Sequence, residues 1–210
     1  LRTWIRDQAQ LLGFSEMCVS DLDVSQALPY LREWLEKGHH GDMHYMIEHA
    51  HLRANPKEIL PQAIRVLSFR MDYLPKTMFG GTEDWRDVEW SKIQNPNSAV
   101  VSVYARGRDY HKVLRARLRD LAKVIENKIA KLNYRVAVDS VPLLEVEIAK
   151  KSGLAWRGKH TLALHRDVGS MFFLGEILID LPIPVDEPIT DHCGQCTACI
   201  EACPTRAIKG

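Results

Sequence analysis

Four of the five cysteines lie close together near the end of the chain. Their spacing is the bacterial ferredoxin pattern C-x2-C-x2-C-x3-C-P, in which thiolates bind [4Fe–4S] clusters. A structural zinc site is the alternative, but zinc proteins usually separate their ligand pairs by about a dozen residues or more. The spacing therefore predicts an iron–sulfur site. The run comprises Cys193, Cys196, Cys199 and Cys203, followed by Pro204.

The last thiolate of such a run binds a different cluster from the first three in two-cluster ferredoxins. Cys203 is therefore expected to bind a second cluster, but the sequence holds no further cysteine run to complete it. We expect residues beyond Gly210 to supply those ligands, and we expect the 210-residue chain alone to be inactive. The fifth cysteine, Cys18, has the apolar setting of a buried thiol.

A second group of candidates consists of polar side chains that follow predicted strands. Asp139 comes directly after a strand predicted at Arg135–Val138, and it could donate a proton near neutral pH if burial beside a ligand raised its pKa. The alternative, which the residue pattern alone favours, is a cap for a helix predicted at Pro142–Lys151. A valine-rich strand predicted at Ala99–Tyr104 leads into four more candidates for ligand contacts. They are Tyr104, Arg106, Tyr110 and His111.

Two further sets of polar residues could contact a ligand or a phosphate group. The first is Arg53, Lys159, His160 and Thr161, each of which taken singly is more often a surface residue. The second is the basic face of a long amphipathic helix predicted at Tyr110–Asn133, although a solvated surface is the commoner role of such a face. That face comprises Lys112, Arg115, Arg119, Lys123, Lys128 and Lys131. The histidines between positions 38 and 51 are interpreted as polar surface.

The elements that must position these residues alternate between helix and strand. Apolar spacing predicts a helix at Leu28–Lys37, and apolar runs predict strands at Ile64–Phe69 and Thr161–Leu164 and a further element at Met171–Ile179. A long excursion is expected at Lys76–Ser98. The alternation predicts an α/β (α+β) fold with a central sheet.

Composition sets limits on organisation and location. With 210 residues and 46% hydrophobic content, the chain can bury a substantial core. A proline-rich stretch at 181–188 predicts a linker between a domain at 1–180 and the start of a [4Fe–4S] domain at 189–210. The net charge of +1 means that nucleic acid would need a local basic patch. No apolar stretch approaches the roughly 20 residues of a membrane helix, and no signal-peptide pattern opens the chain, so a cytoplasmic protein without membrane contact is expected.

Several separate motifs, in order along the chain, resemble the epoxyqueuosine reductase family. The resemblance covers nearly the whole chain and includes the ferredoxin run. The motifs are Gly38–Met43, Arg53–Pro56, Tyr104–His111, Val138–Glu145, Gly153–Trp156, Gly158–Thr161 and Phe173–Leu178, with Asp180–Pro182 and Asp186–Pro188.

The resemblance implies a nitroreductase-like domain that binds cobalamin, followed by the start of a ferredoxin-like domain with two [4Fe–4S] clusters in the full-length protein. It implies reduction of epoxyqueuosine to queuosine at the wobble position of tRNA, with Asp139 as the proton donor. The implied partners are tRNA carrying epoxyqueuosine and an external electron donor, and we expect a monomer. Cofactor contacts are expected from Arg53, Tyr104, Arg106, Tyr110, His111, Asp139, Lys159, His160 and Thr161.

Two other functions are compatible with parts of the sequence. A corrinoid iron–sulfur enzyme related to reductive dehalogenases would share the scaffold, but those enzymes use a tyrosine as the proton donor, and here the resemblance points to Asp139. A plain electron-transfer module would explain the cysteine run and leave most of the chain without a role.

Overall fold

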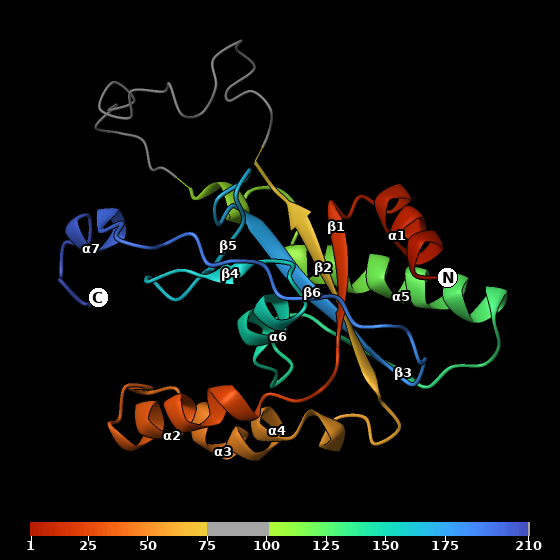
Figure 1. Cartoon of the computed structure of the whole chain (residues 1–210), viewed down its shortest axis with the longest axis horizontal. Helices are drawn as coiled ribbons and strands as arrows, with labels where there is room; N and C mark the ends of the chain where they lie inside the picture. The colour runs from red at the N-terminus through yellow and green to blue at the C-terminus, as the bar shows by residue number, and fades with distance from the viewer. Residues whose placement is uncertain (75–100, 210) are drawn as a thin grey trace, which may run out of the picture.

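A four-stranded antiparallel sheet forms the centre of the structure, a computed structural model that describes residues 1–74 and 101–209 (Figure 1). The strand order is β1-β2-β6-β3. The two long central strands, β2 and β6, pair over their whole lengths, from Arg65 opposite Ile179 to Asp72 opposite Phe172. Because every pairing is antiparallel, the class is α+β, within the predicted range. The strands are β1 (Glu16–Ser20), β2 (Arg65–Asp72), β3 (Tyr134–Ala137) and β6 (Phe172–Ile179).

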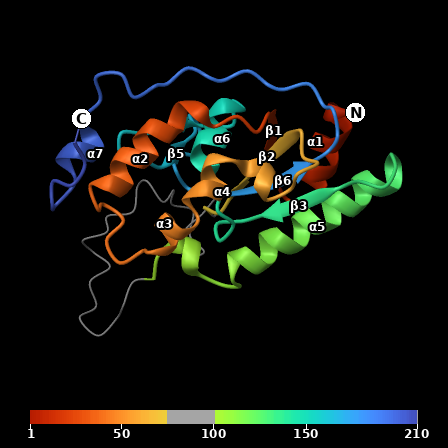
Figure 2. The ribbon, with the colours of Figure 1, turned by 90° about the horizontal axis from the view of Figure 1, so that it is seen from below.

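One face of the sheet is covered by helices α1 (Arg2–Leu11) and α5 (Tyr110–Lys128). Figure 2 shows α5 running along that face. Leu114, Leu118, Leu121 and Ile125 of α5 are buried there, as their three- and four-residue spacing predicts. The helix crosses β6 at Gly175, where an added Cβ would lie 2.9 Å from Leu118 Cδ1. A glycine in β6 therefore allows the close approach of helix and sheet.

The opposite face is covered by α6 (Glu145–Lys151), which packs Ile148 against Val66 and Leu178. Three short helices continue this layer beyond α6 in Figure 1. They are α2 (Leu28–Glu36), α3 (Tyr45–Glu48) and α4 (Ala50–Ala54), with the 3-10 turns η1 (Ser25–Ala27) and η2 (Pro56–Glu58). A small hairpin, β4 (Trp156–Arg157) and β5 (Ala163–Leu164), follows α6.

The proline-rich stretch at 181–188 is an extended strap on the surface of the sheet domain. Ile183 is buried, and the side chain of Asp186 accepts hydrogen bonds from Arg2, Arg6 and the Val19 backbone N–H at 2.8–2.9 Å. The Asp186 N–H in turn donates to Val19 O at 2.8 Å. The segment is therefore fastened along β1 before the chain reaches the cysteine run and the short helix α7 (Ala198–Glu201).

Most expected elements are present, with corrections to the bounds of two helices and to two strands, of which the one expected at Thr161–Leu164 begins only at Ala163. The strand expected at Ala99–Tyr104 is wrong over its described part, because Val103–Ala105 forms the 3-10 helix η4. The helix expected from Pro142 begins only at Glu145, and α5 ends at Lys128 rather than Asn133. The excursion expected at Lys76–Ser98 lies outside the described residues. No helix in the described ranges is long and apolar enough to cross a bilayer.

Candidate active site

Asp139 lies in the loop that follows β3, in a backbone conformation that non-glycine residues rarely adopt. Its φ is 53°, in the left-handed region. The Asp139 N–H donates to Glu145 Oε1 at 2.7 Å, and Glu145 is the first residue of α6. The interpretation of Asp139 as a helix cap is wrong, because α6 is preceded by Leu144 and has no side-chain cap. The loop instead turns the Asp139 carboxylate away from α6.

The Asp139 carboxylate is held by two side chains from the first turn of α5. Tyr110 Oη donates to Asp139 Oδ2 at 2.7 Å, and His111 Nε2 lies 2.8 Å from the same oxygen. His111 is held from the other side by Asp109, whose Oδ1 lies 2.9 Å from His111 Nδ1 and also caps α5 through the His111 N–H. The Tyr110 ring stacks on Phe173 of β6, with centroids 4.2 Å apart. The sheet and the helix end thus fix one acid–imidazole–acid chain.

The charges of Asp139 and His111 are set by competition between burial and hydrogen bonding. Burial acts to raise the pKa of Asp139, but the hydrogen bonds from Tyr110 and His111 outweigh it, so the pKa lies below its ordinary value. Burial acts to lower the pKa of His111, but the two carboxylates outweigh it, so that pKa is raised. In the protein alone the pKa of Asp139 is therefore lowered, whereas the expected rise was tied to burial beside a ligand. The proton shared between the two groups is held by His111.

Two acids lie behind the loop, of which Glu176 is fully buried and Glu145 is half-buried. Glu176, in the middle of β6, is fully buried, and burial raises its pKa well above the ordinary range, with the negative charge of Glu145 adding to the effect. Burial also raises the pKa of Glu145 to about 7, although the hydrogen bond from the Asp139 N–H acts against it. This pair therefore retains protons that ordinary glutamates lose.

Asp139 opens onto a cavity of about 710 Å³ between α2, α3, α6 and the β4–β5 hairpin. Its side chain is 58% exposed, so it is accessible to a ligand. Arg53 and Thr161 of the expected cofactor contacts line the same cavity. The Arg53 side chain is buried, which lowers its pKa, and its guanidinium lies over the Tyr45 ring at 6.0 Å. The wall also includes Tyr30, Trp34, Tyr45, Leu143, Glu145 and Arg157.

The other expected contacts are not among the residues that line this cavity. Tyr104 packs edge-on against Tyr110, with centroids 6.4 Å apart, and Arg106 Nε donates to Val101 O at 2.9 Å. His160 is a turn residue of the β4–β5 hairpin, where its Nδ1 accepts from the Leu162 N–H at 3.2 Å. Thr161, beside it, has a φ of 74°.

Lys159 contacts the cysteine run. Its Nζ donates to Gly194 O at 2.9 Å and to Cys196 O at 3.0 Å. A second contact joins the same parts, because the His192 ring meets the Trp156 ring edge-on at 5.0 Å. The β4–β5 hairpin therefore connects the sheet domain to the segment that carries the thiols.

The four thiols of the run are free, partly or fully exposed, and arranged around a tight turn and α7. The turn is closed by the Cys196 N–H, which donates to Cys193 O at 2.8 Å. Backbone N–H groups that follow Cys203, that of Ile208 first, together with the Thr205 hydroxyl, lower the pKa of Cys203 to about 7. Among the described residues, no three Cys, His, Asp or Glu side chains converge on one point. The donor set nevertheless suits iron–sulfur ligation by its chemistry and spacing.

The sequence did not identify Asp109, Glu145 or Glu176 as site residues. All three lie inside the motifs that carry the family resemblance, but only the contacts of Asp109 and Glu145 show what these two residues do. Glu176 left a signal that could have been used, because it is the one acid in the apolar strand FFLGEILI. An acid in a buried strand is rare unless it has a role.

Comparison with known proteins identifies two regions of the chain. Residues 53–140 match the family model described as epoxyqueuosine reductase QueG, DUF1730, and residues 187–209 match a 4Fe-4S binding domain. The epoxyqueuosine reductase of Alicycliphilus denitrificans is 52% identical over 204 residues, which cover 97% of this chain and 56% of the relative.

Solved structures match as well. The structure of epoxyqueuosine reductase from Streptococcus thermophilus superposes with a TM-score of 0.81 and 27% identity, over 100% of this chain and 54% of that one. A crystal structure of an epoxyqueuosine reductase with an epoxyqueuosine-modified tRNA stem loop has a TM-score of 0.76 at 22% identity, which supports the fold alone.

Fold and cysteine run together define an iron–sulfur protein whose α+β domain carries an acid-lined cavity. The chain belongs to the epoxyqueuosine reductase family and matches its N-terminal portion. It spans about half the length of the curated relatives that it matches.

Proposed function

We propose that the protein reduces epoxyqueuosine to queuosine at the wobble position of tRNA, in the cytoplasm and as a monomer supplied by an external electron donor. The reaction takes up two electrons and two protons per epoxide. Both C–O bonds of the epoxide break, a C=C bond forms, and the oxygen leaves as water. The observation that carries the proposal is the hydrogen-bonded chain Asp109–His111–Asp139, which opens onto the 710 Å³ cavity in a member of this family.

We propose cobalamin as the ligand of this cavity, because the lining offers hydrogen-bond donors for the amide groups of such a cofactor. Among the described residues, the buried guanidinium of Arg53 donates one hydrogen bond, to Tyr45 O at 3.4 Å, so its other donors are available to carbonyl groups. Arg53, the Thr161 hydroxyl and the aromatic wall would hold the cofactor. Cobalamin would supply electrons at a potential that side chains cannot provide. Tyr104, Arg106, Tyr110, His111, Lys159 and His160 remain proposed as cofactor contacts.

Asp139 is the proposed proton donor, acting together with His111. Because the pKa of His111 is raised and that of Asp139 is lowered, the proton would rest on His111 Nε2 and be delivered to substrate by way of the Asp139 carboxyl group. Tyr110 orients the carboxylate and is itself held by Phe173. Glu145 fixes the loop through the Asp139 N–H. Transfer by a positioned acid contributes roughly 10²–10⁴-fold to a rate.

The cysteine run is proposed to bind [4Fe–4S] clusters within a second domain that begins near 189, with 181–188 as the connection from the sheet domain. Cys193, Cys196 and Cys199 would bind one cluster, and Cys203 a second one. The contacts of Lys159 with Gly194 and Cys196 support a fixed position of this loop beside the cavity. Electrons would then have a short route from the clusters to the cavity.

The test is Asp139→Asn in the full-length enzyme carrying its cofactors. We expect product formation, measured as queuosine in digested tRNA, to fall by roughly 10²–10⁴-fold, because the amide cannot donate the proton of a carboxylic acid. Corrinoid absorbance and iron content should match those of the unsubstituted enzyme. Asp167→Asn, at an acid whose side chain is 80% exposed, serves as the control and should leave the rate unchanged. Unchanged turnover in Asp139→Asn would refute the proposed role.

A further inference from the structure

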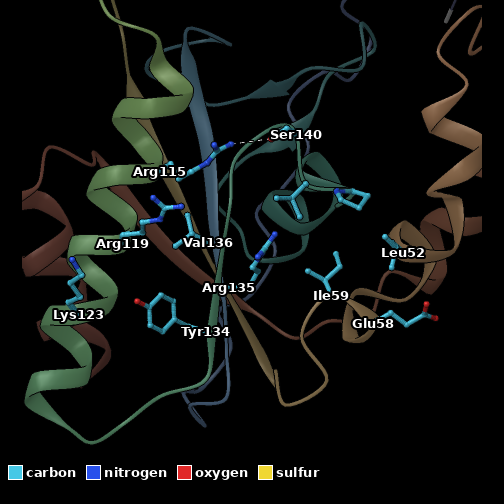
Figure 3. Close-up of a pocket in the computed structure, with 12 residues that line it drawn as sticks. Leu52, Glu58, Ile59, Arg115, Arg119, Lys123, Tyr134, Arg135, Val136 and Ser140 are labelled. Atoms are coloured by element: carbon cyan, nitrogen blue, oxygen red, sulfur yellow. Dashed lines mark hydrogen bonds between the residues drawn. The ribbon is translucent and has the colours of Figure 1, made fainter.

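A second cavity of about 770 Å³ lies along the outer edge of the sheet, apart from the one that Asp139 lines. Figure 3 shows its two walls and its floor. Side chains of α5 form one wall, η2 and the end of α4 form the other, and β3 lies between them. It is lined by Leu52, Glu58, Ile59, Arg115, Arg119, Lys123, Tyr134, Arg135, Val136, Ser140, Val141 and Pro142.

The charge of this groove is strongly one-sided. Four of the lining residues are cations, namely Arg115, Arg119, Lys123 and Arg135, and one is an acid, Glu58. The carboxylate of Glu58 already has one hydrogen-bond donor, since its Oε1 accepts from Asn55 Nδ2 at 3.1 Å. Within the described ranges, Arg119 and Arg135 make no ion pair, although the whole chain carries a net charge of only +1. A local concentration of unpaired guanidinium groups favours a polyanion.

The floor of the groove adds donors from the backbone. β3 pairs with β6 on one side, and no described strand pairs with its other side. A free strand edge presents unpaired N–H groups, which extended partners can use. Tyr134, whose ring faces the α5 wall in Figure 3, supplies a flat surface beside them. Guanidinium groups, backbone N–H groups and one aromatic ring are the groups that bind a single-stranded or looped RNA backbone.

The groove reaches the candidate active site through Arg115. Its Nη2 donates to Ser140 Oγ at 3.1 Å, and Ser140 is the residue directly after Asp139. A nucleic acid strand in the groove would therefore contact the loop that carries the proposed acid. A nucleic acid backbone bound in the groove and a base bound at Asp139 can therefore belong to one continuous molecule.

We propose that this groove, defined by Arg115, Arg119, Lys123 and Arg135, binds the phosphodiester backbone of the tRNA anticodon stem-loop while the modified base occupies the Asp139 cavity. The inference rests on the proposed function, and it adds the surface on which the substrate lies. It also gives the basic face of α5 a role beyond solvation.

The test is the double variant Arg119→Gln/Arg135→Gln of the full-length enzyme, with an unmodified anticodon stem-loop RNA as the probe. We expect affinity by fluorescence anisotropy to fall on the order of tenfold, and the slope of log K against log salt to fall by about 1 to 2. In turnover of epoxyqueuosine tRNA, KM should rise by a similar factor while kcat at saturating tRNA stays unchanged, since the side-chain partners of the proposed acid are Tyr110 and His111 and neither substituted residue. Substituting lysine at both positions should keep most of the affinity, because charge rather than shape is required.

Two further variants distinguish RNA binding in the groove from a general effect of lost positive charge or of misfolding. The sequence grouped Lys128 with the basic face, but in the structure it does not line the groove, and its Nζ lies 5.9 Å from the Trp4 ring. Lys128→Gln therefore removes one charge from the same helix outside the groove and should leave affinity unchanged. Glu58→Gln removes the acid of the groove and should tighten RNA binding about two- to threefold. The second result tests the groove even if the double variant fails to fold.

Some outcomes would overturn the proposal. If the unsubstituted enzyme reduces the epoxide while the double variant keeps its RNA affinity, salt slope and KM, the groove does not bind the RNA and the proposed function stands. If the enzyme does not reduce the epoxide but the double variant still loses RNA affinity, the proposed function fails and the groove remains an RNA site. Unchanged RNA affinity together with tight binding of polyglutamate would assign the groove to an acidic peptide strand instead.

Discussion

At the scale of single residues, the candidate site depends on the conformation of Asp139. A positive φ costs a non-glycine residue of order 1–3 kcal/mol, so it persists only where the surroundings hold it in place. Here the holding contacts are the hydrogen bond to Glu145 from the backbone and those from Tyr110 and His111 to the side chain. Helix capping does not explain an aspartate in this conformation, because Asp139 caps no helix. A functional role of its carboxylate does explain it.

The first prediction concerns Asp109 and the pH dependence of turnover. Asp109 helps to raise the pKa of His111, so the shared proton is retained above 6.5, the ordinary value for histidine, and is lost as pH rises through the raised pKa. Asp109→Asn keeps a hydrogen-bond acceptor for His111 and for the helix cap, but it removes the negative charge. The pKa of His111 should therefore fall, and the alkaline limb of the kcat profile should move to lower pH.

The measurement is kcat against pH for the full-length enzyme and for Asp109→Asn. Below the alkaline limb the two rates should agree within about twofold, because the geometry is retained. A limb that stays in place would exclude His111 as the holder of the proton. A uniform loss of rate at every pH would instead indicate that Asp109 acts only by placing the histidine.

The sequence could identify Asp139 but not its environment. The motif around Val138–Glu145 pointed to the residue through a family resemblance. Its partners Tyr110 and His111 lie 28 to 29 residues away, and only the packing of α5 against β6 brings them together. Lys159 shows the same limit, since local pattern did not predict its contact with the cysteine run. Side-chain direction between distant segments cannot be predicted from local pattern.

At the scale of elements, strongly periodic segments were predicted well and irregular ones were not. The helix α5 and the strand β2 follow directly from their apolar spacing. The strand expected at Ala99–Tyr104 rested on valine content, and its described end is instead a 3-10 turn leading to the Asp109 cap. The strap at 181–188 was expected as a linker because prolines interrupt regular structure. Its fastening depends on one aspartate that local pattern does not distinguish.

The second prediction concerns that fastening. Asp186→Ala should destabilise the chain by about 2 kcal/mol, because the half-exposed Arg2 and Arg6 lose their acceptor and the Val19 N–H loses its hydrogen bond. For a chain of this size, that change corresponds to roughly 4–8 °C in Tm. Thermal unfolding followed by circular dichroism is the measurement. Glu187→Ala, at the exposed neighbouring acid, is the matched control and should change Tm by less than about 1 °C. Equal effects from both variants would show that the strap is not fastened by Asp186.

At the scale of the whole molecule, the fold keeps a feature that works against its own stability. Glu176 is a fully buried acid in β6, and the half-buried Glu145 at the start of α6 holds the loop that carries Asp139. Most chains would fill such a position with an apolar side chain, because burial of an acid is costly. Conflicts between local chemistry and core packing concentrate at functional sites. The position of the pair behind Asp139 is consistent with a site that tolerates instability for the sake of its geometry.

The third prediction follows from the pKa values of this pair. In the unfolded chain both acids ionise near 4.5, whereas in the folded chain burial raises the pKa of Glu145 to about 7 and holds the pKa of Glu176 well above 4.5. Folding therefore becomes less favourable as pH rises above 4.5, since the unfolded state releases protons that the folded state must retain. Glu176→Gln removes one of these groups and keeps its shape. The variant should gain on the order of 1–3 kcal/mol relative to the unsubstituted chain at about pH 8, and much less at about pH 5. Thermal unfolding of both chains at the two pH values measures the difference, and a gain or loss of equal size at both would contradict a buried acid that is protonated in the folded state.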